Sequence, residues 1–153
     1  MSLSATADHA LRAVLVLARA SAGGRPARTA DELAAATGAP RNYLSKTLHA
    51  LARAGVLTGT RGPHGGFALA VDPAALTIAG IVDLFGAPRP HTRCLLGSGP
   101  CDAARACAAH HRWTAVLAAR RAPLAATTIA ELAGLPTAVK PAPDAGAFLP
   151  SAA

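Results

Sequence analysis

The segment from Thr29 to Ala54 carries two helical patterns joined by a tight turn, an arrangement that few folds accommodate. Thr29 and Glu32 have the spacing of a capping box, in which each side chain accepts a hydrogen bond from the other residue's amide, and they predict a helix over Ala30–Thr37. Gly38-Ala39-Pro40 interrupts the helical pattern, which resumes from Arg41 to about Ala54. Two short helices separated by a glycine-containing turn of this length are typical of a helix-turn-helix. The second helix has one apolar face, formed by Leu44, Leu48 and Leu51.

A hairpin pattern follows directly. Strand-like residues at Val56–Thr58 and Gly66–Leu69 flank a basic, glycine-rich loop, which predicts a two-stranded wing. Apolar residues recur at helical spacing in three further places, at residues 4–21, 77–85 and 107–121. We therefore predict a mainly α fold, a winged helix-turn-helix domain with a two-stranded wing and a long C-terminal helix.

The charge of the chain indicates a polyanionic partner. The chain has 15 Lys and Arg against 8 Asp and Glu, a net charge of +7 and a pI near 10.7. Nucleic acid or an acidic membrane surface would suit this balance, although an arginine-rich composition without a special partner would also produce it. Because no Asp or Glu occurs between Gly38 and Ala70, where the helix-turn-helix and the wing are predicted, we favour double-stranded DNA.

The predicted second helix carries a polar face that suits DNA. The N-terminal residues of a recognition helix reach base edges, so Arg41 and Asn42 are predicted to read guanine and adenine. Phosphate or mixed contacts are predicted for Ser45, Lys46 and His49. In the wing, Arg61 and His64 are predicted to enter the minor groove or to bind phosphates. A solvated basic helix face, or a protein-interaction module, would present similar residues.

All three cysteines of the chain fall within one short segment, as Cys94, Cys101 and Cys107. An odd, clustered set does not form a disulfide framework and indicates a metal or iron–sulfur site. The start of the chain lacks the pattern of a signal peptide, and no apolar run reaches the ~18 residues of a membrane span. We therefore expect no membrane association and a cytoplasmic location, where thiols stay reduced.

Several chemistries remain open for this cysteine segment. Three thiolates leave one position of a four-ligand iron–sulfur site for a weaker ligand, and His110 lies close by. A zinc site with three Cys and one His is the main rival, although its usual knuckles are shorter than the C-x6-C spacing. A metal-free thiol switch would use the same residues. An enzyme is not expected, because the chain has no C-x-x-C motif, no nucleotide-binding glycine pattern and no evident acid–base pair.

Four segments of the chain resemble the IscR/NsrR group of winged-helix regulators, the Rrf-two family. Residues 7–13 look like the opening helix of that family, and residues 42–55 look like its recognition helix. Residues 61–70 are similar to its wing motif, which is its most specific signature, and residues 128–132 are similar to a segment after its long helix. The similarity covers about residues 4–134.

The resemblance implies a homodimer joined through the long helix, and a 2Fe–2S or 4Fe–4S cluster on Cys94, Cys101 and Cys107. The C-x2-H-x2-W run that begins at Cys107 is similar to the IscR arrangement and implies His110 as the fourth ligand. NsrR-type members carry, at the position of Asp8, an aspartate that ligates the cluster of the other subunit. The first cysteine interval is one residue longer than in the IscR pattern, so the subtype and the choice of fourth ligand stay open.

In this interpretation the chain divides into a DNA-binding domain at 1–86, a cysteine loop with a dimerisation helix at 87–134, and a disordered tail at 135–153. Loss, oxidation or nitrosylation of the cluster would shift the cysteine loop and the dimerisation helix. The DNA-binding domains of the two subunits would then change their orientation relative to successive major grooves. The predicted function is thus a transcriptional regulator, most simply a repressor, that responds to nitric oxide, redox state or iron–sulfur supply.

Overall fold

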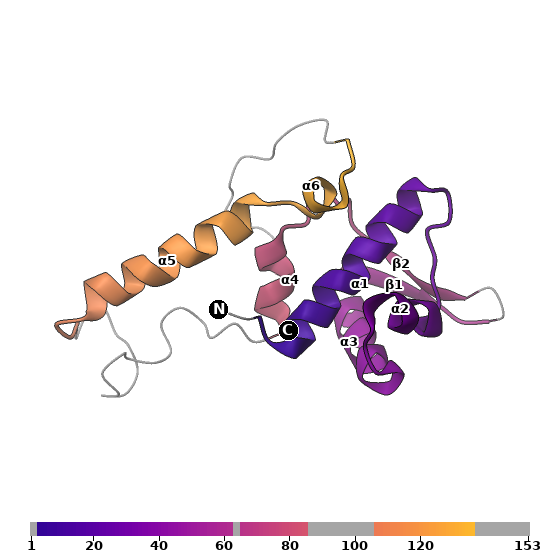
Figure 1. Ribbon diagram of the computed structural model, residues 1–153, viewed down its shortest axis with the longest axis horizontal. Coiled ribbons are helices and arrows are strands. Elements are labelled where there is room, and N and C mark those ends of the chain that lie inside the picture. Colours follow the sequence, from indigo (N-terminus) through magenta and orange to yellow (C-terminus); the bar gives the residue numbers. More distant parts are fainter. Residues whose placement is uncertain (1–2, 63–64, 86–105, 137–153) are drawn as a thin grey trace.

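The computed structural model describes residues 3–62, 65–85 and 106–136. Within these ranges the chain forms helices and one two-stranded antiparallel sheet (Figure 1), which confirms the predicted mainly helical fold class. In chain order the elements are α1 (Ala5–Ala22), α2 (Ala30–Thr37), α3 (Arg41–Arg53), β1 (Leu57–Thr60), β2 (Gly66–Leu69), α4 (Ile78–Leu84), α5 (His110–Ala126) and α6 (Ile129–Ala133).

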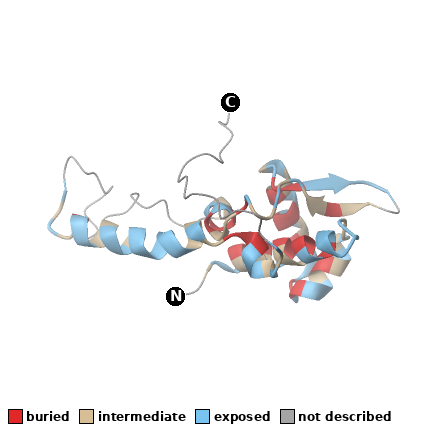
Figure 2. Cartoon of the chain, turned by 90° about the horizontal axis from the view of Figure 1, so that it is seen from above, coloured by how far each residue is buried: buried red, intermediate tan, exposed pale blue. Residues whose placement is uncertain are grey.

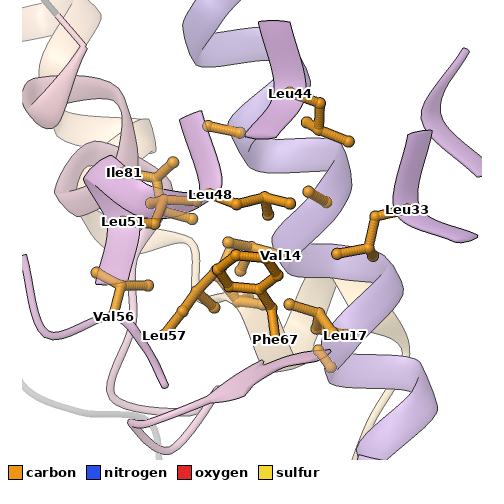
Figure 3. Close-up of a cluster of buried hydrophobic side chains, with 14 of the residues drawn as sticks. Val14, Leu17, Leu33, Leu44, Leu48, Leu51, Val56, Leu57, Phe67 and Ile81 are labelled. Atoms are coloured by element: carbon orange, nitrogen blue, oxygen red, sulfur yellow. The ribbon is translucent and has the colours of Figure 1, made fainter. Parts of the chain in front are cut away.

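Helix α1 forms the centre of the core, because α2, α3, α4, α6 and β2 all pack against it. Its Val14 and Leu17 are fully buried among side chains from these elements (Figure 3). The inward face predicted for α3 is confirmed, since no surface is exposed on Leu44, Leu48 and Leu51. Helical spacing in residues 4–21 predicts one inward face of this helix, formed by Ala7, Leu11, Val14, Leu15 and Ala18, and this is only partly right. Leu11 and Leu15 are half-buried, whereas Leu17, outside that set, is enclosed because neighbours cover α1 from more than one side.

The predicted helix-turn-helix is formed by α2 and α3. The hydroxyl of Thr29 accepts a hydrogen bond from the Glu32 amide at 3.2 Å, and the Glu32 carboxylate accepts one from the Thr29 amide at 2.8 Å, so the capping box is confirmed. Gly38 ends α2 with φ of 69°, a left-handed conformation that glycine adopts without steric cost. Helix α3 follows Pro40, and Gly55 stands after its C-cap with φ of 74°, where glycine is favoured.

The wing is anchored to the segment that precedes α2. Strands β1 and β2 pair over their whole length, and β1 begins one residue later than predicted because the Val56 amide donates to the carbonyl of Leu51 at the end of α3. An isolated bridge, which was not predicted, joins Arg28 to Phe67 through amide–carbonyl hydrogen bonds of 2.9 and 2.7 Å. The segment just before α2 and the wing are therefore held together by backbone contacts. Residues 63 and 64, at the tip of the wing, lie outside the described residues.

The C-terminal helices lie on the other side of α1. Helix α6 returns the chain to the core, where Ile129 has no exposed surface, and its amide donates to the carbonyl of Leu76 at 2.8 Å. Thr77 and Thr128 form a bridge beside this bond. A segment close to the C-terminal end of the described chain thus packs directly onto α1.

Helix α5 leads away from the core as a rod with mostly exposed residues (Figures 1 and 2). It begins at His110 rather than near Cys107, because residues 108 and 109 form a turn, and it continues past the predicted end at Arg121 to Ala126. The predicted domain boundaries stay predictions, and residues 137–153 of the predicted tail lie outside the described residues. None of the helices within the described ranges has the length and apolar content needed to cross a membrane.

Candidate nucleic-acid interface and metal centre

Helix α3 presents a polar surface beside its buried leucines. No acidic residue occurs in α3, so this surface carries positive charge that suits the DNA backbone. Every residue of α3 that was predicted to contact DNA reaches the surface, with Ser45 half-buried and the others exposed: Arg41, Asn42, Lys46 and His49. Their accessibility is what an interface requires, and their contacts with DNA stay a prediction.

Arg41, the first residue of α3, has a partner on the preceding helix. Its Nε donates a hydrogen bond to Oδ1 of Asp31, in the first turn of α2. The two side chains are 62% and 67% exposed, so this ion pair contributes at most about 1 kcal/mol to stability. Sequence reasoning missed Asp31, because it precedes the acid-free stretch and only the packing of α2 against α3 brings it to Arg41.

Two edge-on ring contacts connect α3 to its neighbours. The ring of His49 meets that of Phe67 on β2 at a centroid distance of 5.4 Å and an angle of 78°. At the other end of α3, the ring of Tyr43 meets that of His9 on α1 at 5.8 Å, and its hydroxyl is hydrogen-bonded to Thr6. These contacts fix the orientation of α3 relative to the wing and to α1. His49 therefore has a packing role besides its predicted contact with phosphate.

The backbone of the wing passes very close to the backbone of the segment before α2, and this contact holds the wing in place. A Cβ atom on Gly66 would lie 2.6 Å from the carbonyl oxygen of Arg28, so only glycine permits this crossing. Arg61 is exposed just beyond β1, where it is accessible to DNA. His64, the other predicted wing contact, lies outside the described residues.

The candidate metal centre is described at one of its three cysteines. Cys107 is half-buried just before α5, and the amide of His110 donates to its carbonyl at 2.9 Å, which closes one turn. His110 is 7% exposed, and its ring lies edge-on to that of His111. Cys94 and Cys101 lie outside the described residues, within which no three His, Cys, Asp or Glu side chains are grouped to hold a metal ion. A thiolate and an imidazole on one turn both suit iron or zinc.

Asp8, the other candidate for the fourth ligand, lies far from this turn in the same chain. It stands in the first turn of α1, where it accepts a hydrogen bond from Arg12 at 2.9 Å and complements the helix dipole. Figure 1 shows the beginning of α5 at the far tip of this rod, well away from the first turn of α1. The structure therefore does not bring Asp8 to Cys107 and His110 within one chain, and only a second chain could supply it to that turn.

Comparison with known proteins identifies a group of similar sequences. The family model Rrf2, described as an iron-dependent transcriptional regulator, matches residues 3–134. A protein of Mycobacterium tuberculosis, provisionally named an HTH-type transcriptional regulator, is 35% identical over 139 residues, which are 88% of this chain and 82% of that protein. A similarly named protein of Aquifex aeolicus is 39% identical over 85 residues, which are 54% of this chain and only 59% of that relative. The HTH-type transcriptional regulator IscR of Escherichia coli is 28% identical over 74% of this chain and 68% of its own length.

Solved structures share the fold. CymR, the global cysteine regulator of B. subtilis, superposes with a TM-score of 0.71 at 22% identity, over 88% of this chain and 97% of CymR. IscR of T. potens superposes with a TM-score of 0.68 at 21% identity, over 86% of this chain and 85% of that protein. At these identities the likeness shows a common fold and nothing more.

Proposed function

Because this chain belongs to the Rrf2 family of helix-turn-helix transcriptional regulators, and is not an enzyme, we propose that it binds operator DNA as a cytoplasmic homodimer under the control of an iron–sulfur cluster. The exposed, acid-free surface of α3 beside the wing supports the DNA-binding part. The cluster part is supported by one observation above all, the backbone turn that opens α5 and holds half-buried Cys107 and buried His110.

The cluster ligands in this proposal are Cys94, Cys101 and Cys107, with His110 or the partner subunit's Asp8 as the fourth. The donor set fits the group, because soft thiolates bind iron and imidazole is a weaker ligand that makes a site labile. When bound, an iron–sulfur cluster supplies a centre that reacts with oxidants and nitric oxide. His110 itself is largely out of contact with solvent, which suits a ligand whose release is controlled.

Dimerisation through α5 is the second part of the proposal. Val116 is 49% exposed on this rod, and Trp113 and Leu117 are half-buried beside it, so α5 carries apolar surface that a second copy of the helix would cover. Arg121 of α5 forms an ion pair with Asp83 of α4, and α4 packs on α1. A displacement of α5 would therefore be transmitted through α4 to the DNA-binding domain. Two arrangements of the dimer that differ in the position of α5 would then differ in their affinity for operator DNA.

The decisive experiment is an anaerobic visible spectrum with iron and sulfide analysis of the wild type, His110→Ala, Asp8→Ala and the control His111→Ala. We expect a coloured wild-type protein that contains iron and sulfide, and an altered spectrum for the variant that has lost the fourth ligand. His111→Ala changes an exposed neighbour and should leave the spectrum as it is. A colourless protein loaded with zinc would instead establish a structural metal site. Operator binding that ignores nitric oxide and oxidants would also overturn the proposal.

A further inference from the structure

The ion pair between Asp31 and Arg41 lies where DNA reading is proposed. Asp31 stands in the first turn of α2 and Arg41 in the first turn of α3, two helices that pack against each other at the side of the molecule that carries the wing (Figure 1). The other acid in that turn, Glu32, is engaged in the capping box and pairs with Arg25 at 2.8 Å. Asp31 is thus the carboxylate that meets the proposed guanine reader.

The atoms in contact leave the reading edge of Arg41 accessible. A guanidinium group pairs bidentately with guanine through two N–H groups, most directly through its terminal Nη atoms. Asp31 accepts from Nε, on the side of the group, and the hydrogen bond restricts the torsions of a long, flexible side chain. We propose that Asp31 is a positioning residue that directs the Nη atoms of Arg41 toward guanine, an inference that rests on the proposed DNA-binding function.

The carboxylate of Asp31 has a second effect that can be separated from the first. Its negative charge, on a side chain that is 67% exposed, repels the phosphates of any DNA that approaches α3, whatever the sequence. The hydrogen bond to Arg41 acts only on the base pair that Arg41 reads. Asp31 would therefore lower affinity for all DNA by a similar factor, and only its hydrogen bond to Arg41 would raise discrimination at one base pair.

Two substitutions at Asp31 distinguish these effects. Asp31→Asn keeps an oxygen that can accept from Nε but removes the charge, whereas Asp31→Ala removes both. We expect Asp31→Asn to bind every sequence about two- to threefold more tightly at low salt, with its discrimination kept. For Asp31→Ala we expect, in addition, a loss of about two- to fivefold in discrimination at one base pair, the range that an exposed ion pair can transmit.

The experiment begins with a DNA sequence selected from a random library by the wild-type protein. Affinities are then measured for duplexes with each base pair changed in turn, using the wild type, both Asp31 variants, Arg41→Ala and the double variant Asp31→Ala with Arg41→Ala. Asp31→Ala and Arg41→Ala should lose discrimination at the same base pair, and the double variant should lose no more than Arg41→Ala alone. The control Asp72→Asn neutralises another exposed carboxylate and keeps the oxygen that accepts from the Ala74 amide, so it should leave the preference at that base pair unchanged.

Thermal unfolding of each variant, followed by circular dichroism, shows whether it is folded. Asp31→Asn still tests the effect of the negative charge on DNA affinity even if Asp31→Ala weakens the start of α2. The inference would fail, with the proposed DNA-binding function intact, if Asp31→Ala changed the affinity equally for all duplexes. It would also fail if Asp31→Ala lost discrimination at a base pair where Arg41→Ala has no effect. A wild-type protein that selects no sequence would overturn the proposed DNA-binding function, and the inference with it.

Discussion

Replacement of Ile129 by alanine should destabilise the DNA-binding domain, although this residue lies close to the C-terminal end of the described chain. Ile129 has no exposed surface and belongs to the same buried cluster as Leu17 of α1. The substitution therefore leaves a cavity against α1, the helix on which the remainder of the core packs.

The size of the effect follows from the atoms removed. Isoleucine has three more carbon atoms than alanine, and their transfer from water contributes about 2.4 kcal/mol at about 0.8 kcal/mol for each buried group. The cavity adds to this loss, and substitutions of this kind cost about 2–5 kcal/mol in well-packed cores. Because a domain of this size is stable by only about 5–15 kcal/mol, the variant should be close to the limit of stability.

Urea unfolding followed by circular dichroism measures this loss. With a slope of about 2 kcal/mol per molar urea, the midpoint should fall by about 1–2.5 M. Leu132→Ala is the matched control on the same short helix, because Leu132 is 39% exposed and its truncation should cost less than about 1 kcal/mol. All samples need one protein concentration, since dimerisation would contribute to the measured stability. Equal midpoints for the two variants would refute the assignment of α6 to the core.

Three further predictions concern the wing, the capping box and the helix face. Gly66→Ala should destabilise the protein by at least about 2 kcal/mol in urea unfolding, because its Cβ would meet the Arg28 carbonyl, whereas Gly59→Ala, where the nearest side-chain atom lies at 3.5 Å, should be nearly neutral. The hydrogen bond from the Thr29 amide, with help from nearby arginines, lowers the pKa of Glu32 below its ordinary value of 4.5, so this contribution to stability is complete above that value and disappears as pH falls through the lowered pKa. The stability difference between the wild type and Glu32→Gln should therefore be larger at neutral pH than at acidic pH, and a constant difference would contradict the role of the charge. In affinity titrations across salt concentrations, Lys46→Ala should weaken binding evenly and flatten the salt dependence, whereas Asn42→Ala should relax preference at one base pair; identical behaviour of the two would refute their separate roles.

Local signals predicted most of the elements that carry the candidate interface. The Thr29–Glu32 capping box and Gly55 after the C-cap of α3 act over a few residues, so sequence spacing alone indicates them. The basic face of α3 was predictable for the same reason, because one face of a helix repeats at fixed spacing. The candidate metal centre was predictable only as a set of residue types, and the structure adds the backbone turn between Cys107 and His110.

Tertiary packing decided the contacts between segments that are far apart in the chain. The bridge from Arg28 to Phe67, the burial of Ile129 against α1 and the choice of Asp31 as the partner of Arg41 have no local signature. The separation of Asp8 from the turn that opens α5 belongs to the same class. Periodicity in a sequence specifies which face of an element is apolar or charged, but which other element covers that face depends on how all of them pack around α1.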